Sequence, residues 1–316
     1  MGVEAAVATE SATLDPNSKA SAGALSPRSG DDAGSPPPNM RSRVRSLIRA
    51  HPLTSFFLLT LVLSWWPWPL YATGHFPLPI ASFGPFLAAL LIVGLAEGRS
   101  GLRALVRSML HWRVPVRWWL AFVTVPVVIT LTALALNLLL GAQPPSATQL
   151  SAWTGVPLTF AAALLVPGAG GAWEEPGWRG YALPRLMDRY GWKAASLILG
   201  AVSAAWHLPL ILSDQVSWWD LLLVVAYNIV IARLFLASGR SVLLVMVLHA
   251  TNNAVSGGFV SQLFTGADAS QQAAITALIW AAAAGVLLTI KGHRSRRLET
   301  TSAGRDSASS HSKDIG

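Results

Sequence analysis

The chain has 316 residues, of which 53% are hydrophobic and 12% are charged. Soluble domains carry charge on roughly a quarter of their positions, so this composition indicates an integral membrane protein. Cysteine is absent, which excludes disulfides, thiol nucleophiles and cysteine-dependent metal or haem sites. The net charge of +8 does not indicate a nucleic-acid partner, because the arginines lie in loops and tails. We therefore expect the partner to be a lipid bilayer.

The two ends of the chain differ from its centre. Residues 1–50 begin with a stretch rich in Ser, Ala, Gly and Pro and end in a run of arginines. Such a stretch cannot bury enough apolar surface to fold, so we expect a disordered tail with a basic end. Residues 292–316 are polar and are predicted to form a second disordered tail. No apolar signal-peptide core lies near Met1, so the first apolar segment is expected to remain as an anchor.

The region between the tails, residues 51–291, contains apolar segments of the length that crosses a ~30 Å hydrocarbon core. In chain order these segments are 52–72, 77–96, 117–141, 156–186, 192–212, 218–237, 241–262 and 271–291. We predict an all-α, polytopic membrane bundle of about eight transmembrane helices. The functional core is expected at about residues 150–260.

The positions of the basic residues predict how this bundle is oriented. Arginine and lysine are frequent in the loops on one side of the bundle, whereas the opposite loops contain neither. The loops without them are 73–76, 142–155, 213–217 and 263–270. Because positive charges concentrate in cytoplasmic loops, both termini are predicted to be cytoplasmic. The protein is expected to be a multi-pass protein of the cell membrane.

Few titratable side chains fall at bilayer depth. Of the 15 Asp and Glu residues, only Glu174 and Glu175 lie well inside a predicted span. Of the seven histidines, only His207 and His249 do. A charged group at this depth costs at least ~2.5 kcal/mol and normally faces a protein interior or a water-filled cavity. These four residues are therefore candidates for a functional site.

The ends of the spans place three of these candidates at comparable depths. Counting back from Arg185 at 1.5 Å per residue places Glu174 about 16 Å below the membrane surface. Counting forward from Arg240 places His249 about 13 Å below it. His207 is expected to lie somewhat deeper. A shared pocket near the middle of the membrane is therefore predicted.

Helical spacing assigns different roles to the polar residues. Glu175 and Arg179 are four positions apart, so they can pair on one helix face and neutralise each other. Glu174 is then the unpaired acid and the candidate general base. His249 and Asn253 are also four apart, and their imidazole and amide can supply two hydrogen-bond donors to an oxyanion.

Taken together, these motifs resemble the CPBP (CAAX protease and bacteriocin-processing, ABI-type) family of intramembrane proteases. The motifs are EExxxR from Glu174 to Arg179, a histidine on the next span at His207, and HxxxN from His249 to Asn253. The family includes the CAAX prenyl endopeptidases, and the resemblance covers about residues 150–260. It implies an intramembrane endopeptidase that acts on a membrane-associated protein or peptide, of which a prenylated CAAX protein is one example.

The resemblance also implies residue roles. In the family, the first glutamate and the second-motif histidine activate a water, while the third-motif histidine and asparagine stabilise the oxyanion. In this chain the corresponding residues are Glu174, His207, His249 and Asn253, supported by Glu175 and Arg179.

Two details qualify the match between the motifs. The second motif is usually FxxxH, whereas here Ser203 stands four residues before His207 and the aromatic Trp206 is adjacent to it. Asn252 is a competitor for the role of Asn253, but the family spacing favours Asn253.

Two alternatives remain open from the residues. Glu174, His207 and His249 could together bind zinc, since catalytic zinc sites often use three such ligands and a water. We favour chemistry without a metal or other cofactor, because the His and Asn pair fits an oxyanion site. The Glu, Arg and His cluster could instead serve a proton-coupled transporter or a non-catalytic membrane partner protein, although the inverted repeats common in transporters are not apparent.

Overall fold

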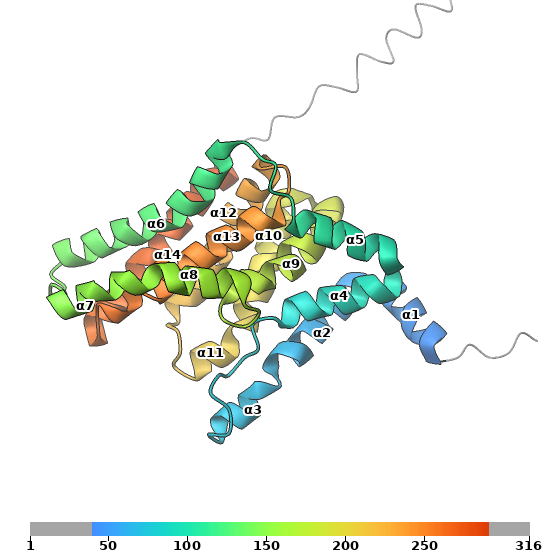
Figure 1. The fold of residues 1–316 in the computed structure, drawn as a ribbon, viewed down its shortest axis with the longest axis horizontal. Helices are drawn as coiled ribbons and strands as arrows, with labels where there is room; N and C mark the ends of the chain where they lie inside the picture. Colours follow the sequence, from blue (N-terminus) through green and yellow to red (C-terminus); the bar gives the residue numbers. More distant parts are fainter. Residues whose placement is uncertain (1–39, 291–316) are drawn as a thin grey trace, which may run out of the picture. The chain divides into compact units, whose positions relative to one another are not determined.

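In the computed structural model the described residues are 40–290, which contain helices and loops but no β-strand (Figure 1). The chain divides into two units, residues 1–40 and 41–316, and the fold described below is that of the second. The tails predicted before residue 40 and at residues 292–316 lie outside the described residues.

The predicted N-terminal tail ends earlier than expected, because its last residues form helix α1 (Met40–Ala50). Two contacts hold this segment. The Ile48 side chain is buried. The Arg49 guanidinium donates hydrogen bonds to the carbonyl oxygen of Ala96. The expectation of disorder is therefore wrong for this helix.

Among residues 40–290, six helical stretches are long and apolar enough to cross a membrane. They are Pro52–Ala72, Val116–Leu139, Gly171–Leu212, Trp219–Ala237, Val242–Gln262 and Gly266–Thr289. The first contains α2 (Pro52–Trp65) and α3 (Pro67–Ala72); the second, fourth and sixth are α6 (Val116–Leu139), α12 (Trp219–Ala237) and α14 (Gly266–Thr289). The prediction of an all-α, polytopic membrane bundle is confirmed.

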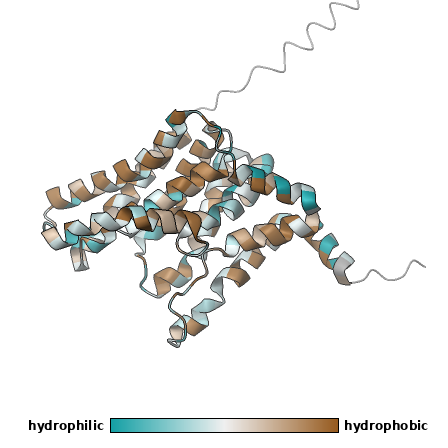
Figure 2. Cartoon of the chain, in the orientation of Figure 1, coloured by the Kyte–Doolittle hydropathy of each residue, from teal (hydrophilic) through white to brown (hydrophobic). Residues whose placement is uncertain are grey.

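Helix α6 shows why the bundle needs an apolar surrounding. Figure 2 shows hydrophobic residues along its whole length. Leu120, Val128, Leu131 and Leu139 are exposed on it. A soluble monomer rarely exposes a continuous apolar surface of this kind, whereas lipid chains solvate it well.

Two predicted spans are shorter in the structure than the sequence indicated. The segment 77–96 contains a helix of 13 residues, α4 (Gly84–Ala96), because Pro77 and Pro79 lie in an irregular approach to it. The segment 156–186 is interrupted after α8 (Val156–Leu165). The apolar segment predicted as one span is therefore not one helix, and the sequence PGAGG from Pro167 to Gly171 explains the break, since Gly168 has a φ of 92°.

The chain becomes helical again at Gly171 and continues through a series of helical elements. They are η2 (Gly171–Glu174), α9 (Glu175–Gly177), the π-helix η3 (Trp178–Ala182), α10 (Leu183–Trp206) and α11 (Leu208–Leu212). Gly191, with a φ of 73°, is not helical and divides α10 close to the predicted boundary between the fourth and fifth spans. The number of membrane crossings stays a prediction.

The remaining elements complete the bundle around the site. They are α5 (Gly98–Met109), α7 (Ala147–Ser151), η1 (Ala152–Gly155), α13 (Val242–Asn252), the π-helix η4 (Asn253–Gly257) and η5 (Val260–Gln262). Helix α12 packs against α10 and α14, while α13 packs against α6, α8 and η2. Helix α4 packs against α2 and α9, where a Cβ on Gly177 would lie 2.4 Å from the carbonyl oxygen of Pro85. This close approach explains the glycine in α9.

Candidate active site

The predicted site residues gather around one cavity of about 450 Å³. Its wall is built from the loop before η2, the C-terminal part of α10, helix α12 and the junction of α13 with η4. Five of the six predicted residues line it: Glu174, Arg179, His207, His249 and Asn253. Glu175 does not line the cavity and lies behind it, so the structure brings together residues that are up to 79 positions apart in sequence.

Glu174 is the last residue of η2 and its side chain is 5% exposed. Its Oε2 accepts a hydrogen bond from the indole Nε1 of Trp178 at 3.2 Å. Trp178 was not among the predicted site residues, although it has the same four-residue spacing from Glu174 that pairs Glu175 with Arg179. The indole fixes one carboxylate oxygen and leaves Oε1 for another partner.

Gly171 shows where the Oε1 atom of Glu174 points. A Cβ added to Gly171 would lie 2.9 Å from Oε1 of Glu174 and 2.1 Å from Nε2 of His249. The two atoms therefore approach the same small volume from different helices, and their separation is at most the sum of these distances. Because Gly171 has no side chain, the His249 ring and the Glu174 carboxylate can pack directly against its backbone. Sequence reasoning missed this glycine.

Glu175 is fully buried and contacts two basic groups. Its Oε2 forms an ion pair with Nη1 of Arg179 at 2.8 Å, as the four-residue spacing predicted. Its Oε1 lies 2.6 Å from Nδ1 of His249, a contact that the sequence did not predict. Because a carboxylate only accepts hydrogen bonds, we assign the proton to Nδ1 of His249. The Nε2 atom of His249 is left to face the space beside Gly171.

Arg179 is 2% exposed and lies in the π-helix η3. Its Nη2 donates a hydrogen bond to Oδ1 of Asn228 at 2.9 Å. The amide nitrogen of Asn228 donates in turn to the carbonyl oxygen of Val224 at 2.8 Å. Asn228 therefore anchors the guanidinium to α12, and the guanidinium fixes the carboxylate that contacts His249.

His207 follows directly after α10, and its ring orientation is set by the backbone. Its Nδ1 lies 2.7 Å from the carbonyl oxygen of Ser203. A carbonyl oxygen accepts only, so we assign the proton to Nδ1, and the lone pair on Nε2 is free to accept a hydrogen bond. The Trp206 ring meets the His207 ring edge to face, with 4.8 Å between centroids. Ser203, which stands where the family usually has an aromatic residue, thus orients His207 through its backbone carbonyl oxygen. This contact does not depend on the side chain at position 203.

Asn253 is the first residue of the π-helix η4. Its Oδ1 accepts a hydrogen bond from the backbone N–H of Gly171 at 3.1 Å. The Nδ2 atom of Asn253 therefore keeps its hydrogens for a ligand. Asn252 also lines the cavity, so the structure does not separate the two asparagines by position alone. Short π-helical segments are frequent at functional sites, and η3 and η4 both border this one.

Tyr227 is a further cavity residue that the sequence did not point to. Its ring packs against that of His249 with 5.6 Å between centroids. Tyr227 lines the cavity, but its buried hydroxyl has no hydrogen-bond partner among residues 40–290. Buried hydroxyls are normally bonded, so this oxygen is an unsatisfied polar group next to His249.

The zinc alternative concerns Glu174, His207 and His249. Within the described part of the chain, no three His, Asp or Glu side chains are grouped as metal ligands. His207 and His249 both use Nδ1 in contacts with the protein and keep Nε2 free. An experiment that removes metal from the protein is therefore the test of this alternative.

Comparison with known proteins supports the reading of the motifs. Residues 152–255 match the family of type II CAAX prenyl endopeptidase Rce1-like proteins, and this segment contains all six predicted site residues. The chain is 33% identical over 88 residues to CAAX prenyl protease 2 of Methanococcus maripaludis. This match covers 24% of the chain and 32% of the relative, so the chain spans about a third of that relative's length. The resemblance to the CPBP and CAAX protease family is confirmed.

Proposed function

We propose that the chain is an intramembrane endopeptidase that hydrolyses a peptide bond of a membrane-associated substrate with a water activated by Glu174. One observation carries this proposal. The Oε1 atom of Glu174 and the Nε2 atom of His249 both lie against Gly171 and close to each other, at the wall of a cavity inside the helical bundle. A base and an electrophilic group on two sides of one small volume are what addition of water to a carbonyl requires.

The proposed reaction begins with a water beside Glu174. The free Oε1 of Glu174 takes one proton from this water, while the Nε2 lone pair of His207 accepts a hydrogen bond from its other hydrogen. The oxygen then adds to the carbonyl carbon, and the carbonyl electron pair moves onto its oxygen. When the tetrahedral intermediate collapses, the C–N bond breaks and the leaving amine takes the proton that Glu174 held.

The negative oxygen of the intermediate is stabilised from the opposite side. The Nδ2 amide of Asn253 donates to it because its Oδ1 is already held by the Gly171 N–H. A protonated His249 donates from Nε2, and the carboxylate of Glu175 balances its charge at 2.6 Å. Removing one such donor typically slows catalysis by about 10²–10³-fold. Glu175, Arg179 and the indole of Trp178 position the reacting groups without touching the substrate.

The residues that line the cavity support an apolar substrate. The matched relative is described as a CAAX prenyl protease. Side chains on one part of the cavity wall are aliphatic: Leu78, Ile80, Leu210, Val216 and Leu223. We therefore propose a prenylated C-terminal CAAX peptide as the substrate class, with the lipid group or aliphatic residues against this apolar wall.

The proposal is tested with the full chain purified in detergent and placed in liposomes. A farnesylated CAAX peptide and the same peptide without the lipid are incubated with it, and the products are identified by mass spectrometry. We expect release of the terminal tripeptide from the farnesylated peptide, and we expect the rate to be unchanged after exhaustive treatment with a zinc chelator. Loss of cleavage on chelation, with recovery when zinc is added back, would contradict the metal-free mechanism and support a zinc-dependent one. If neither peptide were cleaved, the prenyl-CAAX assignment would be contradicted.

Gly171→Ala is expected to reduce kcat/KM by about 10²-fold, since displacement of reacting groups by ~1 Å has effects of this size. The added methyl group would occupy the volume between Glu174 and His249, and both side chains would have to move. The matched control is Gly285→Ala in α14, where a Cβ meets no atom within 4 Å. Cleavage rates and thermal unfolding of the two variants are compared. Unchanged kcat/KM in Gly171→Ala would show that the close packing of Glu174 and His249 against Gly171 is not needed for cleavage.

A further inference from the structure

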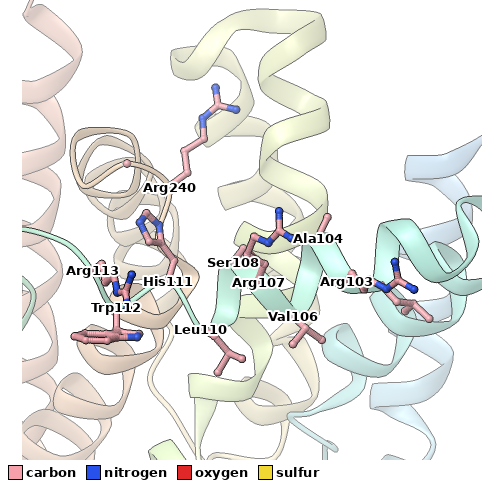
Figure 3. Close-up of a pocket in the computed structure, with 12 residues that line it drawn as sticks. Arg103, Ala104, Val106, Arg107, Ser108, Leu110, His111, Trp112, Arg113 and Arg240 are labelled. Carbon is pink, nitrogen blue, oxygen red and sulfur yellow. The ribbon is translucent and has the colours of Figure 1, made fainter.

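A second cavity, of about 1090 Å³, lies along α5 and the link that follows it (Figure 3). It shares no lining residue with the cavity that contains Glu174. Residues 102–113 supply one wall, and the turn between α12 and α13, at Gly239 and Arg240, supplies the other. The proposed protease mechanism makes no use of this second cavity.

The charge of this second cavity is strongly positive. Its lining contains four arginines and a histidine but no Asp or Glu: Arg103, Arg107, Arg113, Arg240 and His111 (Figure 3). Within residues 40–290, the side chains of these four arginines form no ion pair and no hydrogen bond, although the Arg113 guanidinium lies over the Trp112 ring. Guanidinium groups are well suited to bind phosphate by parallel hydrogen bonds. These exposed guanidinium groups are therefore free to bind an anion.

The same region also exposes large apolar side chains. Val106, Leu110 and Trp112 line the cavity and are 45%, 64% and 60% exposed. Helix α5 carries its arginines four residues apart, with apolar residues between them. Arg103, Val106, Arg107 and Leu110 share one exposed face, while Leu105 is buried in the protein. At a membrane interface, arginine side chains on such a face can reach the headgroups while the apolar side chains contact acyl chains. A free phosphate ion would leave the apolar half of this surface without a partner.

Arg240 occupies a backbone position that is unfavourable for arginine. Its φ is 64°, in the left-handed region, and it follows Gly239, whose φ is 80°. Residues other than glycine held in this region are strained and are concentrated at functional sites. Arg240 lines the cavity from the turn between α12 and α13 (Figure 3).

The two walls are joined at the start of α13. The hydroxyl of Ser241, next to Arg240, donates a hydrogen bond to the carbonyl oxygen of His111 at 2.6 Å. The same hydroxyl caps α13 by accepting from the N–H of Leu244 at 3.2 Å. The position of Arg240 relative to the arginines of α5 is therefore fixed by the helix that also carries His249.

We propose that this second cavity binds the phosphate of an anionic phospholipid, with Arg103, Arg107 and Arg240 around the headgroup and Val106, Leu110 and Trp112 against the acyl chains. Basic pockets between helices at a membrane surface are known to bind anionic headgroups. The positive charge selects an anionic lipid, and the exposed apolar side chains select a lipid over a soluble anion.

The proposal is tested by native mass spectrometry of the full chain in detergent, titrated with phosphatidylglycerol or with phosphatidylcholine. Wild type is expected to bind the anionic lipid at least about ten-fold more tightly than the zwitterionic one. The triple variant Arg103→Gln, Arg107→Gln, Arg240→Gln is expected to lose this preference. A control with the same loss of charge, Arg45→Gln, Arg99→Gln, Arg189→Gln, changes exposed arginines outside the cavity and is expected to keep it.

A second variant separates binding from folding. Arg240→Gly relieves the left-handed backbone strain, so it is expected to fold at least as stably as wild type while its preference for phosphatidylglycerol falls several-fold. An unchanged preference in this variant and in the triple variant would overturn the proposal. So would an equal loss in the control variant, or displacement of phosphatidylglycerol by millimolar inorganic phosphate. Because lipid binding is the readout, the result does not depend on whether the chain cleaves peptides.

Discussion

Glu174→Gln is expected to lower the rate of peptide cleavage by about 10²–10⁴-fold, the range that a general base contributes. An amide cannot take the proton from the attacking water, so the first step of the proposed reaction loses its base. The substitution keeps the size of the side chain and an oxygen that can accept from the Trp178 indole at the position now 3.2 Å away. The fold is therefore expected to survive.

The measurement compares kcat with the farnesylated peptide and thermal unfolding in the same detergent. Asp188→Asn is the control, because it makes the same chemical change at an exposed position of α10. It is expected to leave both quantities unchanged. Cleavage by Glu174→Gln at more than about a tenth of the wild-type rate would contradict the role of Glu174 as the base.

The sequence located much of this site because two kinds of information are local. Charge at the ends of the spans placed Glu174 and His249 at similar depths, and the structure brings both to the space beside Gly171. The four-residue spacing identified the ion pair of Glu175 with Arg179, which the structure contains. Both inferences use only the positions of residues within single spans, and neither needs knowledge of how the helices pack.

For the same reason, contacts between distant segments could not be predicted from the sequence. The contact of Glu175 with His249 joins residues 74 positions apart, and no local pattern encodes it. Asn253 holds Gly171 across 82 positions. The break after α8 is different, because the proline and glycines of PGAGG were visible but were interpreted as part of an apolar span. Hydrophobicity over a window of about 20 residues cannot distinguish a helix from a buried loop that lines a cavity.

Glu175→Ala is expected to lower the free energy of unfolding by about 3–5 kcal/mol, the usual effect of removing one partner from a buried ion pair. The guanidinium of Arg179, 2% exposed, would keep its charge and lose its carboxylate. The control is Glu97→Ala, which removes the partner of Arg185 from a half-exposed pair. Its expected effect is within about 1 kcal/mol. Unfolding by denaturant in detergent measures both.

The double variant Glu175→Gln, Arg179→Met separates the two contacts of Glu175. Replacing both buried charges with neutral side chains of similar volume is often neutral, so most of the lost stability is expected to return. Cleavage is expected to stay low, because His249 still lacks the carboxylate that lies 2.6 Å from its Nδ1. If cleavage returned together with stability, Glu175 would only support the fold. If neither returned, Arg179 would be needed for more than balancing Glu175, and its bond to Asn228 would be the next contact to remove.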